Sequence, residues 1–228
     1  GDTQKPGPAV EALKTSFPGY FPFLSLDQGQ KDDALIIGPG GGRDILLALM
    51  GGVGKITAVE VNRDLVDMVR SHSPFNGGIY RDLSNVQVVT EEGRHFLKRD
   101  RKRYDLIMMS LPVTNTSRSL EGFALTENFL FTTDAVSEYW DHLSEEGRLL
   151  VVAHHDIEAL RLLSLTLAFF GANGMDERQA MRHIYITGSE DYMVFVLAKK
   201  PLQPAETAFL YRAMPPLGYD PGRSFFPR

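Results

Sequence analysis

The sequence of 228 residues contains no cysteine, which excludes disulfides and thiolate metal sites. It has no run of the roughly 18 apolar residues that a membrane-spanning helix needs, and it shows no signal-peptide pattern. It also has no basic excess, since the net charge is −5 at pH 7. A large nucleic-acid-binding surface normally requires a basic face. We therefore expect a cytoplasmic chain that does not bind nucleic acid.

The composition that remains is that of a folded domain. Hydrophobic residues make up 43% of the chain and charged residues 23%, which is enough apolar material for a sizeable core. Both ends are rich in proline and glycine. We predict an irregular N-terminal arm over 1–33, a main domain over 34–200 and a wrapping tail over 201–228.

Within the main domain, apolar strand patterns alternate with helical patterns. Alternation of this kind predicts an α/β protein with a mostly parallel sheet that is covered on both faces. The expected strands cover residues 34–37, 55–61, 86–89, 104–109 and 148–153, and the expected helices cover 44–50, 63–71, 93–98, 133–143 and 157–170.

The end of the domain follows a different pattern. Two further strand patterns, 183–187 and 192–197, are separated by the four residues Gly-Ser-Glu-Asp. This spacing predicts a β-hairpin, so that the last strand runs antiparallel to its neighbour. Five βα units closed by a hairpin resemble the Rossmann-like class I methyltransferase fold. That resemblance implies a seven-stranded, mostly parallel sheet with a C-terminal antiparallel hairpin.

A glycine loop follows the first expected strand. Gly38, Gly40, Gly41 and Gly42 lie between this strand and the next helix, where a backbone without Cβ atoms can turn tightly and contact a ligand. The dinucleotide fingerprint G-x-G-x-x-G would need a third glycine at Arg43, so the chain matches G-x-G-x-G instead. That variant is typical of S-adenosylmethionine sites. A glycine-rich turn without a ligand is the alternative.

Acidic residues follow the next two strands. Glu60, which precedes Val61, can accept two hydrogen bonds from the two hydroxyls of a ribose. NAD also contains such a ribose, so this acid indicates a nucleoside without identifying it. Glu91 or Glu92 can reach an adenine amino group, and Gly93 would let the base approach. The alternatives are that Glu60 faces water or caps a helix, and that the two later acids only favour the dipole of the helix that they precede.

Five segments resemble the spermidine synthase (polyamine aminopropyltransferase) family in sequence and order, over about residues 34–155. The likeness extends to the soluble domain of bacterial membrane-associated spermidine synthase-like proteins. It implies an S-adenosylmethionine or decarboxylated S-adenosylmethionine donor, a small acceptor such as a polyamine, and membrane helices outside these 228 residues; a homodimer is a further expectation. By position it places Gly38, Gly40 and Gly42 in the donor loop, Glu60 on the ribose and Glu92 near the adenine. The segments are LIIGPGGGRD, ITAVEVN, VVTEEGRHFL, YDLIMMSL and ENFLFTTDAVSEYWDHLSEEGRLLVV.

The chain also departs from this family. Gly41 stands where the family's donor loop has an aspartate, and Asp44 follows three residues later as a candidate substitute. The family motif D-S-S-D-P after the fourth strand is replaced by Ser-Leu-Pro-Val-Thr, beginning at Ser110. Alkylamines have a pKa near 10.4, so an attacking amine needs a base. Ser110 is the candidate catalytic residue, although a serine without a partner is a poor base.

Other candidates surround this acceptor end. Glu121, Glu127 and Asp134 are further candidate carboxylates, and residues 114–123 form a long polar loop that we interpret as a lid. One of His154 and His155 is a candidate for the acceptor cleft; consecutive residues on an extended segment point to opposite faces, so we predict no metal site. Tyr139 and Trp140 are expected in the core, with a pocket wall as the alternative.

Three functions therefore remain open. The first is a transferase that alkylates a small acceptor by aminopropyl transfer. The second is a small-molecule methyltransferase, and the third is a regulatory domain that binds an S-adenosyl nucleoside without turnover. Arg43 and the terminal hairpin argue against an NAD-dependent oxidoreductase.

Overall fold

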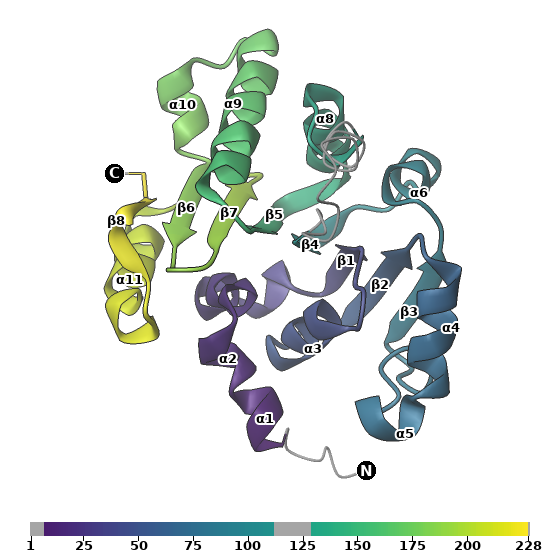
Figure 1. Cartoon of the computed structure of the whole chain (residues 1–228). Helices are drawn as coiled ribbons and strands as arrows, with labels where there is room; N and C mark the ends of the chain where they lie inside the picture. Colours follow the sequence, from purple (N-terminus) through teal and green to yellow (C-terminus); the bar gives the residue numbers. More distant parts are fainter. Residues whose placement is uncertain (1–6, 112–128, 228) are drawn as a thin grey trace.

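A computed structural model describes residues 7–111 and 129–227 of the chain. Its centre is a single twisted sheet with the strand order β3-β2-β1-β4-β5-β7-β6-β8 (Figure 1). The strands β1 to β5 pair in parallel, while β7 is antiparallel to β5 and β6. The strands are β1 (Asp33–Ile37), β2 (Lys55–Glu60), β3 (Val86–Thr90), β4 (Tyr104–Ser110), β5 (Leu143–Ala153), β6 (Ile184–Gly188), β7 (Met193–Ala198) and β8 (Asp220–Phe225). The predicted α/β class I methyltransferase fold is confirmed.

Helices cover both faces of the sheet (Figure 1). One face packs against η1 (Pro18–Ser25), α3 (Arg43–Met50), α4 (Arg63–Ser71) and α11 (Pro204–Ala213). The other face packs against α6 (Gly93–Arg99), α8 (Thr133–His142), α9 (Asp156–Ala172) and α10 (Glu177–Met181). Short turns complete the described chain: α1 (Pro8–Glu11), α2 (Leu13–Ser16), η2 (Gln28–Gln30), α5 (Ser73–Asn76) and η3 (Pro215–Leu217).

The central strands read as continuous apolar runs because each face of the sheet is buried. In β1, Ala34 and Ile36 belong to the core on the α3 side, while Leu35 and Ile37 belong to the core on the α8 side. Successive side chains of a strand point to opposite faces, so every position of the run finds apolar contacts.

The N-terminal segment forms short helical turns and places its aromatic side chains in the core. Phe17, Phe21 and Phe23 are buried on the α3 side of the sheet. Pro18 at the start of η1 fixes the backbone for a turn, and Pro22 lies inside η1, where its missing N–H disfavours a regular α-helix.

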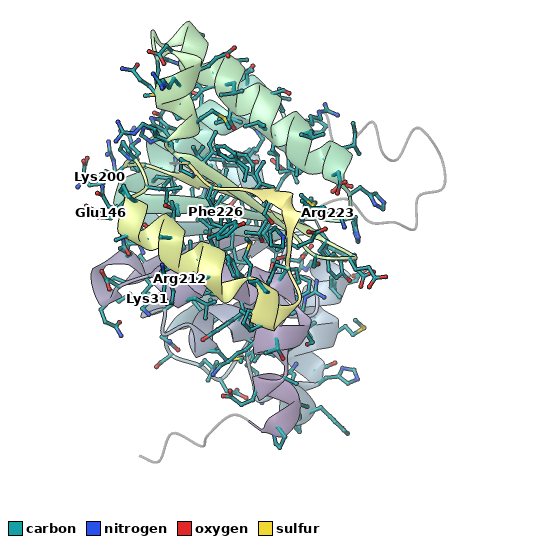
Figure 2. All side chains as sticks on the ribbon, turned by 90° about the vertical axis from the view of Figure 1, so that its left-hand side faces the viewer. Lys31, Glu146, Lys200, Arg212, Arg223 and Phe226 are labelled. Carbon is teal, nitrogen blue, oxygen red and sulfur yellow. The ribbon has the colours of Figure 1, made fainter. Side chains whose placement is uncertain are left out.

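The C-terminal tail adds α11 and an eighth strand, so the predicted count of seven strands is too low. Strand β8 pairs antiparallel with β6 at the edge of the sheet, where Pro221 and Gly222 are tolerated. The tail lies across one side of the molecule (Figure 2), and Phe226 stacks on Tyr185 with ring centroids 5.2 Å apart. Arg223 pairs with Asp156 at 2.5 Å, which ties the edge strand to α9.

One boundary also differs from the sequence prediction. Strand β5 starts at Leu143 instead of residue 148, and α8 ends at His142. Leu143 pairs with Tyr104, and the register then shifts before Leu106 pairs with Arg148. The polar residues at this irregularity have the sequence pattern of a turn.

In the part of the chain that the structure describes, no helix has the length and apolarity that crossing a bilayer requires.

Candidate functional site

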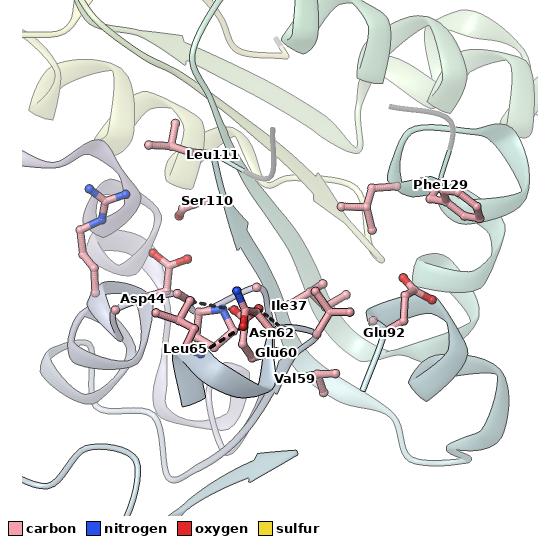
Figure 3. Close-up of a pocket in the computed structure, with 18 residues that line it drawn as sticks. Ile37, Asp44, Val59, Glu60, Asn62, Leu65, Glu92, Ser110, Leu111 and Phe129 are labelled. Atoms are coloured by element: carbon pink, nitrogen blue, oxygen red, sulfur yellow. Dashed lines mark hydrogen bonds between the residues drawn. The ribbon is translucent and has the colours of Figure 1, made fainter. Parts of the chain in front are cut away.

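A cavity of about 880 Å³ opens at the carboxyl ends of β1, β2 and β4 (Figure 3). Ligands of open α/β sheets bind at this edge, where the loops after the strands converge. The volume lies within the range of roughly 300–1,000 Å³ that is typical of small-molecule sites. The cavity therefore lies where the sequence analysis placed the nucleoside.

The glycine loop forms one wall of this cavity. Gly38 and Gly40 adopt left-handed backbone angles, with φ of 67° and 54°. A Cβ atom added at Gly38, Gly40 or Gly41 would meet no heavy atom within 4 Å, because these positions face open space. The loop thus presents backbone without side chains to the cavity, and its contact with a ligand stays a prediction.

Gly42 has a different role from its three neighbours. It is not among the residues that line the cavity. Its φ is 93°, and an added Cβ atom would lie 2.2 Å from Cδ1 of Ile79. Gly42 therefore allows the turn into α3 and the packing of Ile79 beneath it, and we no longer place it against the ligand.

Glu60 lies at the end of β2 with only 6% of its surface exposed. Its carboxylate accepts a hydrogen bond from the backbone N–H of Gly40 at 3.1 Å and another from Asn62 at 3.0 Å (Figure 3). The side chain is therefore fixed at the mouth of the loop. Val61 follows on the cavity wall, where it is 67% exposed.

The acids after β3 have separate partners. Glu92 lines the cavity and caps α6, accepting hydrogen bonds from the backbone N–H groups of Arg94 at 3.0 Å and His95 at 2.8 Å. Glu91 is not part of the lining and pairs instead with Arg99 at 2.6 Å. Of the two candidates for the adenine, the structure brings only Glu92 to the cavity.

Gly93 is needed for packing as well as for access. It lines the cavity, but a Cβ atom there would come within 2.5 Å of Cγ2 of Ile37. A side chain at this position would push α6 away from β1. The sequence pattern indicated a glycine contact with a base, and it did not reveal this second constraint.

Asp44 and Ser110 meet at the end of the cavity near β4. Asp44, in the first turn of α3, is 3% exposed, and its carboxylate points toward Ser110 (Figure 3). Burial raises the pKa of Asp44 to about 6, while hydrogen bonding from Ser110 and the charge of Arg43 oppose the rise. One carboxylate oxygen, Oδ1, is buried without a hydrogen-bond partner among the described residues. Asp44 is thus an acid that carries a proton more readily than a surface aspartate.

The chain leaves β4 through a strained residue. Leu111 has a φ of 52°, a left-handed value that branched side chains rarely adopt. Its N–H donates to the carbonyl of Val152 at 2.8 Å, which holds the turn in place beside the cavity. The rest of the predicted Ser-Leu-Pro-Val-Thr motif, the predicted lid over 114–123, Glu121 and Glu127 lie outside the described residues. Asp134 is in the first turn of α8 and does not line the cavity.

The histidine and aromatic candidates lie away from the cavity. His154 has its ring 6.3 Å from the ring of Tyr192, His155 precedes α9, and neither lines the cavity. Tyr139 is fully buried, and Trp140 packs against Phe170, as the core interpretation predicted. No group of three or more metal-ligating side chains occurs within residues 7–111 and 129–227.

Two contacts to the loop were not predicted from the sequence. The hydroxyl of Tyr80 donates to the carbonyl of Gly40 at 2.5 Å, and burial together with the nearby acids raises the pKa of Tyr80, which keeps the hydroxyl protonated. The guanidinium of Arg43 lies 3.6 Å from the ring centre of Phe17. Both partners come from irregular segments without a periodic pattern. The one available signal was a basic residue directly after the glycines.

Comparison with known proteins supports the fold and a distant relationship. No protein-family model matches the chain. A stretch of 89 residues is 30% identical to a polyamine aminopropyltransferase of Korarchaeum cryptofilum (strain OPF8), covering 39% of this chain and only 27% of that relative's length.

Solved structures resemble this chain over most of its length. Spermidine synthase from Thermotoga maritima superposes with a TM-score of 0.56 and 14% identity, over 86% of this chain and 60% of that one. A probable spermidine synthase from Corynebacterium glutamicum gives 0.59 and 12%, over 90% and 69%. Human methyltransferase-like protein 13, in complex with SAH, gives 0.60 and 15%, over 93% and 92%. At these identities the likeness shows the class I S-adenosylmethionine-dependent methyltransferase fold.

Proposed function

Since the chain is spermidine synthase-like, a distant relative of the polyamine aminopropyltransferases, we propose that it is an S-adenosyl-nucleoside-dependent transferase. It binds S-adenosylmethionine or its decarboxylated form in the cavity above β1 and β2, and it alkylates a small acceptor. A polyamine is the acceptor class that the relatives suggest.

The observation that carries this proposal is the open glycine loop facing a fixed carboxylate. Gly38, Gly40 and Gly41 leave room for a ligand against the backbone, and Glu60 stands beside them with its position set by Gly40 and Asn62. A carboxylate has about four lone-pair sites, so Glu60 retains acceptor capacity for the two hydroxyls of a ribose. Such charge-assisted pairs of hydrogen bonds recognise a diol in one geometry.

The chemistry requires alignment more than it requires strong acids or bases. A lone pair of the acceptor forms a bond to the carbon attached to the sulfonium, and the electrons of the broken C–S bond return to sulfur, which becomes a neutral thioether. The protein holds acceptor, carbon and sulfur in line and excludes competing water. An amine acceptor must first lose a proton, because a protonated amine has no lone pair.

Whether the cavity contains a base for the amine distinguishes a transferase from a second candidate function, a regulatory nucleoside-binding domain. The carboxylates that line the cavity are Asp44, Glu60 and Glu92, and none of them lies on β4 or at Ser110-Leu111 in the described part of that segment. This observation favours a regulatory domain that binds the nucleoside without turnover. A transferase with an acceptor that carries its own lone pair at neutral pH is equally compatible with it.

A binding screen followed by product detection tests the proposal. S-adenosylmethionine, its decarboxylated form and 5′-methylthioadenosine should each raise the melting temperature, whereas NAD should not. A ligand at 100 times its dissociation constant stabilises the native state by about 2.7 kcal/mol. Mass spectrometry of reactions with a panel of polyamines and other small acceptors then distinguishes turnover from binding alone. Failure of all three nucleosides to bind would reject both functions.

A further inference from the structure

The two residues that open α3 carry opposite charges, and both line the cavity. Arg43 and Asp44 are consecutive, and each has a buried polar side-chain atom without a hydrogen-bond partner in the described structure, Nε of Arg43 and Oδ1 of Asp44. Buried polar atoms are nearly always paired, so unpaired atoms on two consecutive residues that line the same cavity indicate groups that a ligand completes.

The side chain of Arg43 is positioned by an aromatic ring and not by an acidic partner among the described residues. Its guanidinium lies 3.6 Å from the ring centre of Phe17, and it forms no ion pair with any residue that the structure describes. An arginine stacked on an aromatic face keeps its N–H groups in the plane, directed outward, where they match a carboxylate. The cavity thus contains a positioned cation, which can pair with an anionic group of a ligand. A ligand that carries only positive charge has no group for it.

Asp44 supplies the complementary anion. Its side chain is 3% exposed and is approached by Ser110 on one side, while Oδ1 has no described partner. An unsatisfied buried carboxylate oxygen is unfavourable, and an ammonium group placed beside it would restore the missing hydrogen bond.

We propose that Arg43 and Asp44 form a subsite for the free amino-acid end of the donor, with the α-carboxylate on Arg43 and the α-ammonium on Asp44. This inference rests on the proposed function and narrows it. S-adenosylmethionine carries both groups on one carbon, whereas its decarboxylated form carries only the amine. The donor is therefore S-adenosylmethionine, and the group transferred is methyl instead of aminopropyl.

The transfer step is balanced without a further reactant. The acceptor's lone pair forms the bond to the methyl carbon, the C–S electron pair returns to sulfur, and the acceptor's proton passes to water. The remaining product is S-adenosylhomocysteine, whose amino-acid end keeps the same contacts. Asp44 is then occupied by the donor and is not the acceptor's base.

A ligand series that removes one group at a time tests the subsite. Calorimetry would compare S-adenosylhomocysteine, its decarboxylated analogue S-adenosyl-3-thiopropylamine, and 5′-methylthioadenosine, which lacks both charged groups. We expect the wild-type protein to bind S-adenosylhomocysteine at least about tenfold more tightly than the decarboxylated analogue, the size of one charge-assisted hydrogen-bond pair. Equal affinities, or a preference for the decarboxylated analogue, would overturn the inference.

Variants assign the two groups. Arg43→Gln should weaken S-adenosylhomocysteine about tenfold and leave the decarboxylated analogue within about twofold, because only the carboxylate contact is lost. Asp44→Asn should weaken both and spare 5′-methylthioadenosine. Arg178→Gln, an exposed arginine on α10, is the matched control and should change nothing. An equal loss for both charged ligands in Arg43→Gln would show that Arg43 acts only through Phe17.

The outcomes separate this inference from the proposed function. Binding of 5′-methylthioadenosine without any advantage for S-adenosylhomocysteine would reject the subsite and keep the nucleoside site. If Arg43→Gln does not fold, Arg43→Lys retains the charge without the planar geometry, and the comparison of ligands on the wild-type protein decides alone.

Discussion

Glu60 accepts a hydrogen bond from the backbone N–H of Gly40 at 3.1 Å, so the acid at the end of β2 is joined to the loop that follows β1. The two residues belong to neighbouring parallel strands, and their loops meet only because those strands pair in register from Asp33 to Ile37. The contact makes one structural unit of the two sequence features on which the nucleoside site depends.

Replacement of Glu60 should affect binding and stability together. In Glu60→Ala, two backbone N–H groups lose their acceptor, which costs about 1–3 kcal/mol for each group that stays buried and unpaired. The ribose contact is lost as well, so the affinity for 5′-methylthioadenosine should fall at least about tenfold. Calorimetry and thermal denaturation measure the two effects, with exposed Glu177→Ala as the control. Unchanged nucleoside affinity would remove Glu60 from the site.

The glycines should separate into two classes on substitution. Gly41→Ala adds a methyl group in open space, so the folded protein should keep its melting temperature while nucleoside affinity drops at least about tenfold. Gly42→Ala places a Cβ atom 2.2 Å from Ile79 at a φ of 93°, and it should destabilise the fold by about 1–3 kcal/mol. Urea denaturation and calorimetry on both variants make the comparison. If Gly42→Ala proved the more damaging to binding at equal stability, our assignment of the two positions would be reversed.

Asp44 should reduce stability at neutral pH. Its pKa is raised to about 6 in the folded protein from an ordinary value of 3.8, so between these values the folded state binds the proton more strongly. Binding of this proton therefore adds to the free energy of unfolding at low pH, and the addition is lost as the pH rises through about 6. At pH 7, Asp44→Asn should therefore be more stable than wild type, by at most about 3 kcal/mol.

The pH profile distinguishes this effect from simple repacking. The advantage of Asp44→Asn should shrink as the pH falls below 6 and vanish near pH 4, as measured by urea denaturation at each pH. Asp67→Asn, at an exposed position on α4, should show no such gap. A difference between wild type and Asp44→Asn that does not change with pH would refute the linkage to this carboxyl.

The tail should depend on a buried ion pair. Arg148 on β5 has 5% of its side chain exposed, and it pairs through both terminal nitrogens with Glu206 on α11. Glu206→Ala leaves that charge buried and unpaired, which costs about 3–5 kcal/mol. The exposed pair of Lys200 and Glu146 (Figure 2) is the control, since Glu146→Ala should cost at most about 1 kcal/mol. Equal costs in chemical denaturation would show that the buried pair does not hold the tail.

Most of the fold followed from the sequence because its central strands are buried on both faces. Apolar runs such as Leu35–Ile37 are recognisable as buried strands because they contain no polar residue. Helices that begin or end at glycine or polar residues separate these runs. Strand β8 was missed because it is partly exposed and contains Pro221 and Gly222, and because its pairing with β6 joins residues far apart in the chain. Pairing at an edge leaves little trace in local composition.

The candidate site divides in the same way. The loop glycines and Glu60 were identifiable because turns without side chains and acids at strand ends are local features. The separate role of Gly42 was not, because Ile79 contacts it from an irregular segment. In the sequence, Arg43 was informative only because it occupies the position of the third glycine of the dinucleotide fingerprint. Its stacking on Phe17 depends on how the N-terminal segment packs.

Gly40 is held at both of its backbone polar groups, by Glu60 at the N–H and by Tyr80 at the carbonyl. A loop anchored in this way has already lost its conformational entropy before any ligand arrives. Association should then be a single diffusional encounter without a slow closing phase in stopped-flow traces, and differences in affinity among ligands should appear in how quickly they leave.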